Sequence, residues 1–234
     1  MTGPEFMVDY YSRVVGIPER KIDLLYNDIQ LERFQTEISA EERDKFRQKY
    51  NLPEECLILL LVHRLSPVRK TLMYLEPFLK KIKEDLAQRH WVLVIAGGGS
   101  ELANAKQLAS TLGVQENVIF LGDVPNLEIP KLYAVGDIFV HPTYTEGFPR
   151  VLIEAMASGL PIVTTDAGGT PQLLGNTQKH YLVNKNDPEE FAARAIELIT
   201  CQQSWAGLGD ENLKTVQRFS TDAVSDMYIN VLFS

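Results

Sequence analysis

Short, continuous apolar runs recur along the chain after about residue 56, separated by segments in which apolar positions repeat at helical spacing. Runs that are apolar at every position are typical of strands buried on both faces of a parallel sheet. The expected strands are Leu57–Val62, Trp91–Ala96, Val118–Leu121, Asp137–His141, Pro161–Thr165 and a short one at Tyr181–Val183.

The segments between these runs predict amphipathic helices. They lie at Leu72–Leu86, Glu101–Leu112, Leu127–Val135, Arg150–Ala157 and Glu189–Ile199. Asp187 and Pro188 mark the start of the last one, because Asp caps helices well and Pro fits the first helical position. Strands that alternate with helices predict an α/β fold, a Rossmann-like doubly wound parallel sheet flanked by helices, with crossovers of one hand.

The first fifty residues differ from the rest. Residues 1–6 are expected to be a leader added to the natural sequence, because a second methionine follows them, and we leave them out of fold reasoning. Residues 7–50 are more polar and predict a leading arm plus a first helix. Ser39 and Glu42 form a capping-box pair at the start of that helix.

Residues 51–234 are expected to form one Rossmann-like domain. Its tail, Trp205–Ser234, has a helical pattern with a break at Phe219–Thr221. The longest apolar run, Cys56–Val62, is too short to span a bilayer, and no secretory signal is visible. Two cysteines form no disulfide framework, which fits a reducing compartment, so we expect a cytoplasmic protein.

The charge composition of the chain limits the kinds of ligand that it is expected to bind. The chain has 234 residues with 31 acidic and 23 basic side chains, a net charge of −8. An acidic surface argues against nucleic acid, because phosphate backbones require a basic stripe. A small anionic ligand held by a few local cations is still compatible with this balance.

Polar and glycine-rich segments follow the expected strands, at the sheet edge where open α/β folds bind ligands. They are Arg64 and Lys70 after the first strand, Gly97–Gly99 after the second, Gly122 and Asp123 after the third, Thr143–Arg150 after the fourth and Asp166–Thr170 after the fifth. Arg64 can grip phosphate oxygens with two hydrogen bonds, and Lys70 adds a point charge. Arg69 competes with Lys70 for that role, and Arg64 and Lys70 have an alternative interpretation as solvated surface side chains.

The glycines favour a tight strand-to-helix turn, for which glycine is the default residue. A dinucleotide-binding turn is the alternative, with Asp123 near the position of a ribose-binding acid. That fingerprint requires a third glycine where this chain has Leu102.

Two glutamates flank the fourth loop. Glu146 lies in the loop, and Glu154 follows after seven intervening residues, inside an apolar helix. A mid-helix glutamate is ordinarily a surface residue, but here apolar neighbours predict burial, and a buried carboxylate needs partners. Ribose hydroxyls are suitable donors. The helix start also offers backbone N–H groups to phosphate or sugar oxygens.

These residues carry a family resemblance. Glu146–Pro161, EGFPRVLIEAMASGLP, followed by Asp166–Gly169, resembles the donor-site signature of family 4 retaining glycosyltransferases of the GT-B fold. Arg64 and Lys70, in RLSPVRK, look like that family's diphosphate-binding pair. Ile22–Phe34 resembles its inter-domain segment, so the similarity covers nearly everything after the leader.

The resemblance implies a nucleotide-sugar donor domain, the C-terminal half of a GT-B enzyme. Glu146 would face hydroxyls of the transferred sugar, and Glu154 would bind the ribose. Arg64 and Lys70 would stabilise the departing diphosphate, so no metal ion or other cofactor is expected. Further donor contacts would come from Gly147, Phe148, Pro149 and Arg150 at the sugar, Val151 and Leu152 near the phosphates, and Gly97, Gly98, Leu121 and Gly122 beside the nucleotide.

Three further positions bear on which substrate the site would bind. Thr71 and His180 stand where the family commonly has glycine, which puts substrate details in question. His141 ends the fourth strand and has two readings, a packing residue or a sugar contact, of which the sequence favours packing.

We therefore expect a UDP-sugar, or another nucleotide-diphosphate sugar, to be the donor of a retaining hexosyl transfer. The acceptor, a saccharide or a lipid-linked one, would be bound by a missing N-terminal domain. That domain would also supply any peripheral association with the inner face of the membrane. The alternatives are a nucleotide-sugar-binding module without transferase activity and, less favoured, an NAD-dependent dehydrogenase domain.

Overall fold

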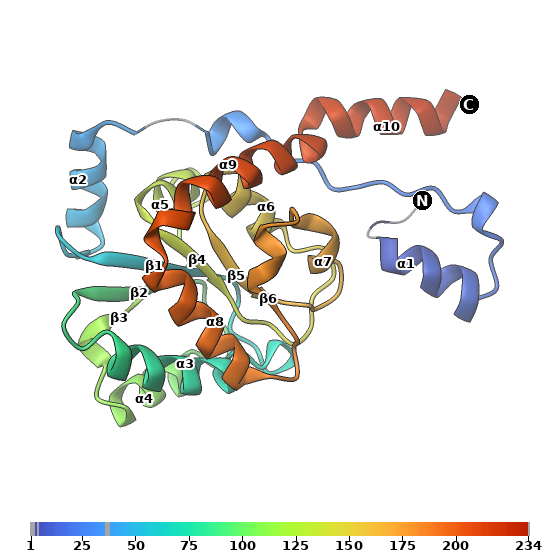
Figure 1. Cartoon of the computed structure of the whole chain (residues 1–234). Helices are drawn as coiled ribbons and strands as arrows, with labels where there is room; N and C mark the ends of the chain where they lie inside the picture. The colour runs from blue at the N-terminus through green and yellow to red at the C-terminus, as the bar shows by residue number, and fades with distance from the viewer. Residues whose placement is uncertain (1–2, 4, 36–37, 234) are drawn as a thin grey trace.

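The computed structural model describes residues 3, 5–35 and 38–233 (Figure 1). Part of the expected leader, residues 1–6, and the last residue of the expected tail therefore lie outside the described residues. Within them, a six-stranded parallel sheet has the order β3-β2-β1-β4-β5-β6. The strands are β1 (Leu57–Val62), β2 (Trp91–Ala96), β3 (Val118–Gly122), β4 (Ile138–His141), β5 (Ile162–Thr165) and β6 (Leu182–Val183).

The sheet is covered on both faces, which confirms the Rossmann-like doubly wound class. All six residues of β1 are buried, with Leu59 and Leu61 in one apolar cluster and Ile58 and Leu60 in the other. A strand that buries both faces needs an apolar side chain at each position, so the run is continuous rather than alternating. The strand order reverses between β1 and β4, and such a switch point opens a crevice at the carboxyl edge.

The helices lie close to their expected positions (Figure 1). They are α2 (Ala40–Lys49), α3 (Thr71–Asp85), α4 (Leu102–Thr111), α5 (Ile129–Val135), α6 (Arg150–Ala157), α8 (Pro188–Thr200), α9 (Trp205–Thr215) and α10 (Thr221–Phe233). The one-turn helix α7 (Thr170–Leu173) was not expected. A 3₁₀ turn at Val216–Phe219 separates α9 from α10, where the sequence predicts a break.

The first helix begins as its capping box predicts. The Glu42 N–H donates to Ser39 Oγ and the Ser39 N–H donates to the Glu42 carboxylate, each at 3.2 Å. The arm before it contains α1 (Glu5–Asp9) and a π turn at Tyr10–Val14. Its Ile29 N–H donates to Phe219 O at 2.9 Å, so the arm runs beside the start of α10, to one side of the sheet (Figure 1).

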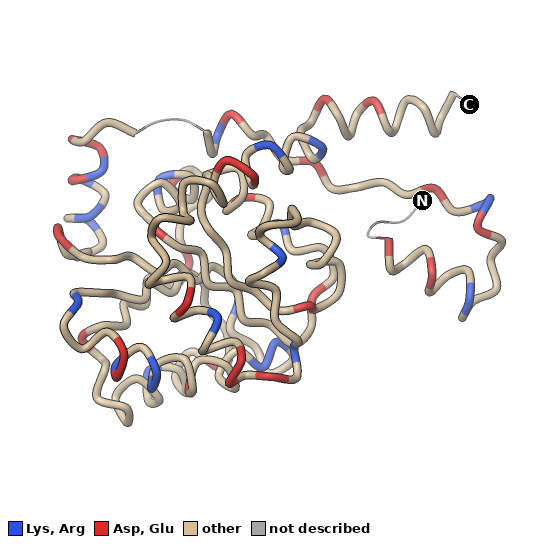
Figure 2. Tube along the Cα trace, in the orientation of Figure 1, with Lys and Arg blue, Asp and Glu red and all other residues tan. Residues whose placement is uncertain are grey.

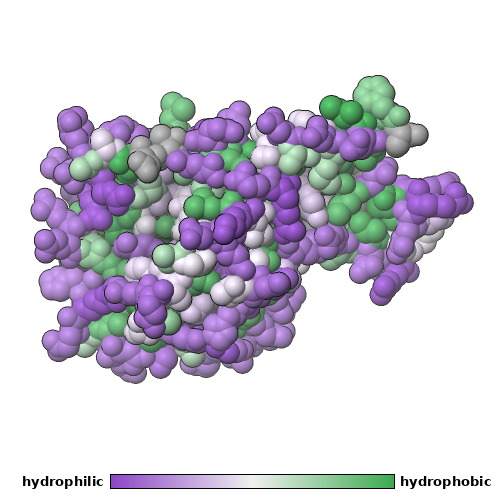
Figure 3. Space-filling view, turned by 45° about the horizontal axis from the view of Figure 1, so that its top comes forward, coloured by the Kyte–Doolittle hydropathy of each residue, from purple (hydrophilic) through white to green (hydrophobic). Residues whose placement is uncertain are grey.

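The surface carries mixed charge and one apolar helix end. Figure 2 shows acidic and basic residues interspersed along the trace rather than segregated. Four apolar side chains are exposed on α10: Tyr228, Ile229, Leu232 and Phe233. Figure 3 shows apolar surface at the far end of that helix. Among the described residues, no helix has both the length and the apolar character needed to cross a bilayer.

Candidate functional site

The loops that follow β1, β4 and β5 hold one another at the carboxyl edge of the sheet. The Tyr144 N–H donates to Arg69 O at 2.7 Å, which joins the β4 loop to the β1 loop. The Gly169 N–H donates to Gly147 O at 2.8 Å, which joins the β5 loop to the β4 loop. The expected convergence of these segments is therefore a backbone-bonded framework.

The glycines after β2 serve close packing against the β1 loop. Gly97 has a φ of +126°, and a Cβ there would lie 2.4 Å from His63 O. Gly99 has a φ of +136°, and its Cβ would lie 2.0 Å from Leu65 O. Only glycine fits both positions. This arrangement favours the tight-turn reading over a dinucleotide fingerprint, and α4 begins directly at Leu102.

A cavity of about 330 Å³ opens beside these glycines. Its lining is Val62, His63, Arg64, Ala96, Gly97, Gly98, Gly99, Asp123, Val124 and Ile129. The Gly98 N–H donates to Asp123 Oδ1 at 3.2 Å. Arg64 is exposed at this cavity, and within the described part of the chain its guanidinium makes no ion pair. Its charge is therefore available to an anion.

The two residues expected beside the nucleotide at the end of the third strand, Leu121 and Gly122, are not among the residues that line the cavity. Asp123 and Val124 line the cavity, whereas Leu121 is half-buried against the core. Gly122 has a φ of +66° and accepts a hydrogen bond from the Gly97 N–H at 2.7 Å. Leu121 and Gly122 therefore support the residues that line the cavity: Leu121 packs against the core, and Gly122 holds the Gly97 backbone.

Glu146 is paired with Arg69, a contact that the sequence did not predict. The Arg69 guanidinium donates to Glu146 Oε2, and the two side chains are 25% and 11% exposed. Glu146 Oε1 accepts from the Gly147 N–H at 3.0 Å. A Cβ on Gly168, whose φ is +55°, would lie 1.8 Å from Glu146 O, so the β5 loop can press against this loop only with glycine there.

Lys70 lies beside this pair but is not part of it. It has a φ of +49°, and its Nζ lies 3.6 Å from the centroid of the Tyr144 ring. The side chain is exposed, with no ion pair to the described residues. Arg69 was considered only as a rival to Lys70; the structure gives the two residues separate contacts, with Arg69 on Glu146 and Lys70 on the aromatic ring.

Two buried histidines lie beneath the Arg69–Glu146 pair. The rings of His63 and His141 are 5.4 Å apart, and each residue is less than a tenth exposed. Burial lowers the pKa of His63 well below its ordinary value, helped by His141 and Arg69. Burial and the Arg69 charge lower the pKa of His141 to about 3. Both rings are therefore neutral at physiological pH.

Glu154 lies on α6, and its side chain accepts a hydrogen bond from a residue of the neighbouring helix α5. The Tyr133 hydroxyl donates to Glu154 Oε2 at 3.0 Å and contacts Val151 O at 3.2 Å. Burial raises the pKa of Glu154, opposed by the Tyr133 hydrogen bond and by the charges of Arg150 and Arg33. Glu154 is half-buried rather than fully buried as expected, and Tyr133 from α5 is a partner that the sequence pattern did not identify.

Not every residue from Gly147 to Leu152 has a backbone N–H free to contact a donor. Pro149 has no N–H and cannot donate. The Leu152 N–H already donates to Pro149 O at 3.0 Å, and the Gly147 N–H is held by Glu146. The groups at Arg150 and Val151 lie in the first turn, where no intrahelical acceptor exists. Phe148 stacks on the Tyr26 ring at 5.7 Å, so its side chain packs against the arm.

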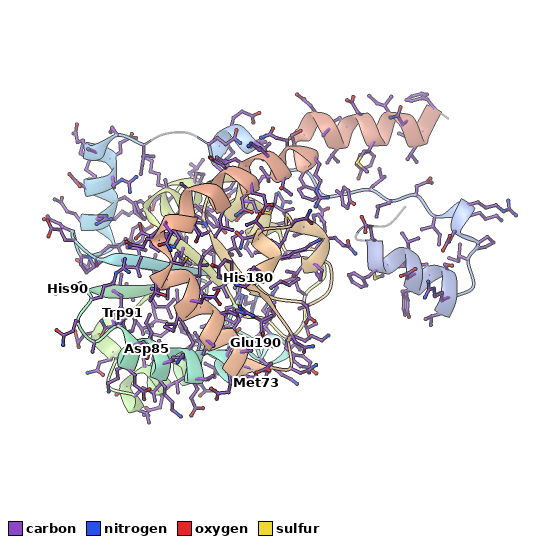
Figure 4. The ribbon with its side chains drawn as sticks, in the orientation of Figure 1. Met73, Asp85, His90, Trp91, His180 and Glu190 are labelled. Atoms are coloured by element: carbon purple, nitrogen blue, oxygen red, sulfur yellow. The ribbon has the colours of Figure 1, made fainter. Side chains whose placement is uncertain are left out.

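His180 lies away from this site. It precedes β6 and so belongs to the amino edge of the sheet, where its Nε2 lies 2.6 Å from Glu197 Oε1 (Figure 4). The histidine that replaces the family's common glycine at position 180 therefore contacts a surface residue of α8 and not the candidate ligand site. The described residues include no cluster of three or more His, Cys, Asp or Glu side chains suited to a metal ion.

The fold and these residues define an α/β domain with a candidate ligand site at the carboxyl edge of a Rossmann-like sheet. Residues 42–215 match the family described as "Glycosyl transferases group 1", and the chain belongs to that family. An uncharacterized glycosyltransferase of Methanocaldococcus jannaschii is 32% identical over 179 residues, which are 76% of this chain and 45% of that protein. N-acetyl-alpha-D-glucosaminyl L-malate synthase of Bacillus anthracis is 26% identical over 217 residues, 92% of this chain and 54% of that protein.

Solved structures share the fold. A glycosyltransferase of Rickettsia africae superposes with a TM-score of 0.85 at 22% identity, covering 97% of this chain and 60% of that one. Anabaena HepE, solved in complex with UDP, gives a TM-score of 0.79 at 24% identity, covering 94% and 59%. The chain spans about half the length of the curated relatives it matches.

Proposed function

We propose that this chain is the nucleotide-sugar donor domain of a retaining glycosyltransferase of family 4, and that it corresponds to the C-terminal half of a GT-B enzyme. The observation that carries the proposal is the convergence at one sheet edge of the Arg64 cavity with the loop of Glu146 and the helix of Glu154. An unpaired cation beside carboxylate acceptors suits a ligand with a diphosphate centre and hydroxylated ends.

Each of these groups has a proposed role. The cavity beside Gly97, Gly98 and Asp123 takes part of the nucleotide, and Glu154 accepts a hydrogen bond from the ribose. Arg64 and Lys70 neutralise the diphosphate, together with the N–H groups of Arg150 and Val151 at the start of α6. Glu146 accepts hydrogen bonds from the transferred sugar once Arg69 withdraws. UDP is favoured as the nucleotide, supported by the UDP bound to Anabaena HepE.

Catalysis in this proposal is electrostatic. Negative charge develops on the diphosphate as the bond to the sugar breaks, and fixed cations at that point lower the barrier more than they stabilise the bound donor. The acceptor hydroxyl attacks from the face that the diphosphate leaves and passes its proton to the departing diphosphate oxygen, so the configuration of the sugar is retained. No metal ion is needed for this step in the proposal.

The acceptor and the cellular location belong to the same proposal. The acceptor, a saccharide or a lipid-linked one, would be bound by a second domain facing this sheet edge. The protein would act in the cytoplasm, at the inner face of the membrane where that second domain associates with it.

The alternative function is a nucleotide-sugar-binding module that does not transfer. A dehydrogenase is less favoured, because the glycines after β2 are used in packing against His63 O and Leu65 O. Binding alone does not separate the first two functions, whereas transfer by the chain together with an acceptor domain does.

A thermal-shift panel with UDP-glucose, GDP-mannose and ADP-glucose tests the proposal. A ligand that binds only the native state raises the melting temperature, and the stabilisation grows with the logarithm of the ligand concentration relative to its Kd. We expect one nucleotide series to stabilise the chain and the isolated chain to transfer sugar poorly. No stabilisation by any of the three would contradict donor binding, and robust transfer by this chain alone would contradict the need for a second domain.

A further inference from the structure

The side chain of His141 has one nitrogen that the described residues do not satisfy. The residue is fully buried at the end of β4, and its Nε2 has no hydrogen-bond partner in the described part of the chain. That nitrogen lies 4.0 Å from Glu146 Oε2, the carboxylate oxygen that Arg69 contacts. Buried polar atoms are rarely left unpaired, so each exception calls for a physical explanation.

The other ring nitrogen fixes which kind of group Nε2 is. His141 Nδ1 lies 3.1 Å from Thr164 Oγ1, and the Thr164 hydroxyl donates its one proton to His141 O at 3.0 Å. With the hydroxyl proton used in that bond, the hydroxyl oxygen accepts from Nδ1, and we assign the imidazole proton to Nδ1 on this basis. Nε2 then carries a lone pair and is an acceptor. Burial keeps this ring neutral, because the pKa of His141 is lowered to about 3.

Two hydrogen-bond acceptors, His141 Nε2 and Glu146 Oε2, thus lie close together. Neither Glu146 Oε2 nor His141 Nε2 can donate, so they cannot satisfy each other across 4.0 Å. His141 Nε2 lacks a donor, and Glu146 Oε2 needs a new one when Arg69 withdraws. Neighbouring hydroxyl groups on a hexose ring supply two donors at a compatible spacing. Arg69, which contacts Glu146 here, is partly exposed on the 3₁₀ turn Pro67–Arg69, so it can withdraw without unfolding a helix or strand.

We propose that His141 Nε2 is a second acceptor for the hydroxyl groups of the transferred sugar, beside Glu146, and that Thr164 fixes it in the acceptor form. This inference rests on the proposed donor site and assigns part of its sugar specificity. It predicts a preference for sugars with free neighbouring hydroxyls at this point. A sugar that places an ether or a carboxylate there would bring a third acceptor and bind poorly.

Nitrogen-15 NMR of the histidine side chains tests the proton position on the full chain. We expect His141, assigned by loss of its signals in His141→Leu, to show an unprotonated Nε2 and a protonated Nδ1. Saturating UDP-glucose should shift the Nε2 resonance, and saturating UDP should not. A protonated Nε2 in the ligand-free protein, or the same response to both ligands, would overturn the proposal.

Calorimetry gives the energetic test. His141→Leu and Thr164→Val should each weaken UDP-glucose about threefold to tenfold, the range of one neutral hydrogen bond, while the affinity for UDP changes less than about twofold. His90→Leu is the matched control, because His90 is exposed before β2 at the opposite edge (Figure 4). It should change neither affinity.

The two proposals fail in different ways. If UDP binds but the ratio of UDP-glucose to UDP affinity is the same in wild type and His141→Leu, an internal water satisfies Nε2 and only the role of His141 is lost. If UDP does not bind, the same titrations are run with GDP-mannose against GDP and ADP-glucose against ADP. If no nucleotide binds, the donor site itself is wrong and the role of His141 falls with it.

Discussion

The guanidinium of Arg69 contacts the carboxylate of Glu146 and joins the loop after β1 to the loop after β4. The pair covers the buried His141 ring, and Glu146 is the less exposed partner at 11%. In the protein without donor, this contact neutralises the carboxylate that we assign to the sugar. In the proposed function, donor binding requires Arg69 to leave Glu146.

A double-mutant cycle measures that contact. Arg69→Met should lower the free energy of unfolding by about 1–3 kcal/mol, because it leaves a mostly buried carboxylate without its donor. Adding Glu146→Gln removes the charge and should recover part of the loss, so the two effects will not add. Urea unfolding of the four proteins gives the coupling energy. Additive effects would show that the two side chains do not interact in solution.

Arg64 should discriminate phosphates from nucleosides. Arg64→Ala is expected to weaken UDP about tenfold to a hundredfold, as for a charge-assisted hydrogen bond, and to leave uridine unchanged. Arg20→Ala is the matched control, because Arg20 is exposed on the N-terminal arm, outside the cavity lining. Isothermal calorimetry with both ligands makes the comparison. Equal losses for UDP and uridine would reject a diphosphate contact.

Glu154 should bind ribose only while it is ionised. Glu154→Gln is expected to weaken uridine about tenfold or more, with little change in stability because the Gln carbonyl still accepts from Tyr133. Burial raises the pKa of Glu154 above its ordinary value of 4.5, so in wild type the affinity for uridine should fall on acidification earlier than for an exposed carboxyl. Titrations at several pH values test this. An affinity unaffected by the substitution would remove the ribose role.

The buried histidines make stability depend on pH. In the unfolded chain His141 takes up a proton as the pH falls through about 6.5, whereas in the folded protein its pKa is about 3. The free energy of unfolding should therefore fall on acidification between those values, by up to about 1.4 kcal/mol per pH unit for each such histidine. His63 adds to the slope in the same direction. His141→Leu should reduce the slope of the unfolding free energy against pH by the contribution of one proton. An unchanged slope would contradict a neutral, buried His141.

Two glycine substitutions separate packing from helix propensity. Gly168→Ala places a Cβ 1.8 Å from Glu146 O at a φ of +55°, so we expect lower stability and weaker binding of UDP-glucose. Gly207→Ala, on α9 with open space around it, should instead raise stability by about 0.5–1 kcal/mol. Thermal unfolding of both variants provides the contrast. Tolerance of alanine at position 168 would show that the β4 and β5 loops move apart freely.

The sheet and most of its helices could be predicted from the sequence, because a strand buried on both faces leaves a continuous apolar run. Leu57–Val62 is the clearest case, with alternate residues in the two apolar clusters. The helix α7 was missed because four residues give too little periodicity. The sequence also does not show which face of the Gly97–Gly99 turn is open, since that depends on the approach of the β1 loop.

The residues of the candidate site could be proposed from the sequence, but the side chains that they contact could not. Glu154 was expected to be buried from its apolar neighbours, yet its partner Tyr133 comes from a different helix. Arg69 and Lys70 are adjacent in the chain and look equivalent, but the left-handed φ at Lys70 turns the two side chains to different contacts. The absence of an N–H on Pro149 was already visible in the sequence.

The most direct test of the central claim is a calorimetric titration of wild type and Arg64→Ala with UDP, GDP and ADP. The account predicts that wild type binds one of the three with a stoichiometry of one per chain, and that Arg64→Ala weakens that nucleotide at least about tenfold. Binding of none of them, or equal binding by both proteins, would contradict a nucleoside diphosphate site at the carboxyl edge of this sheet.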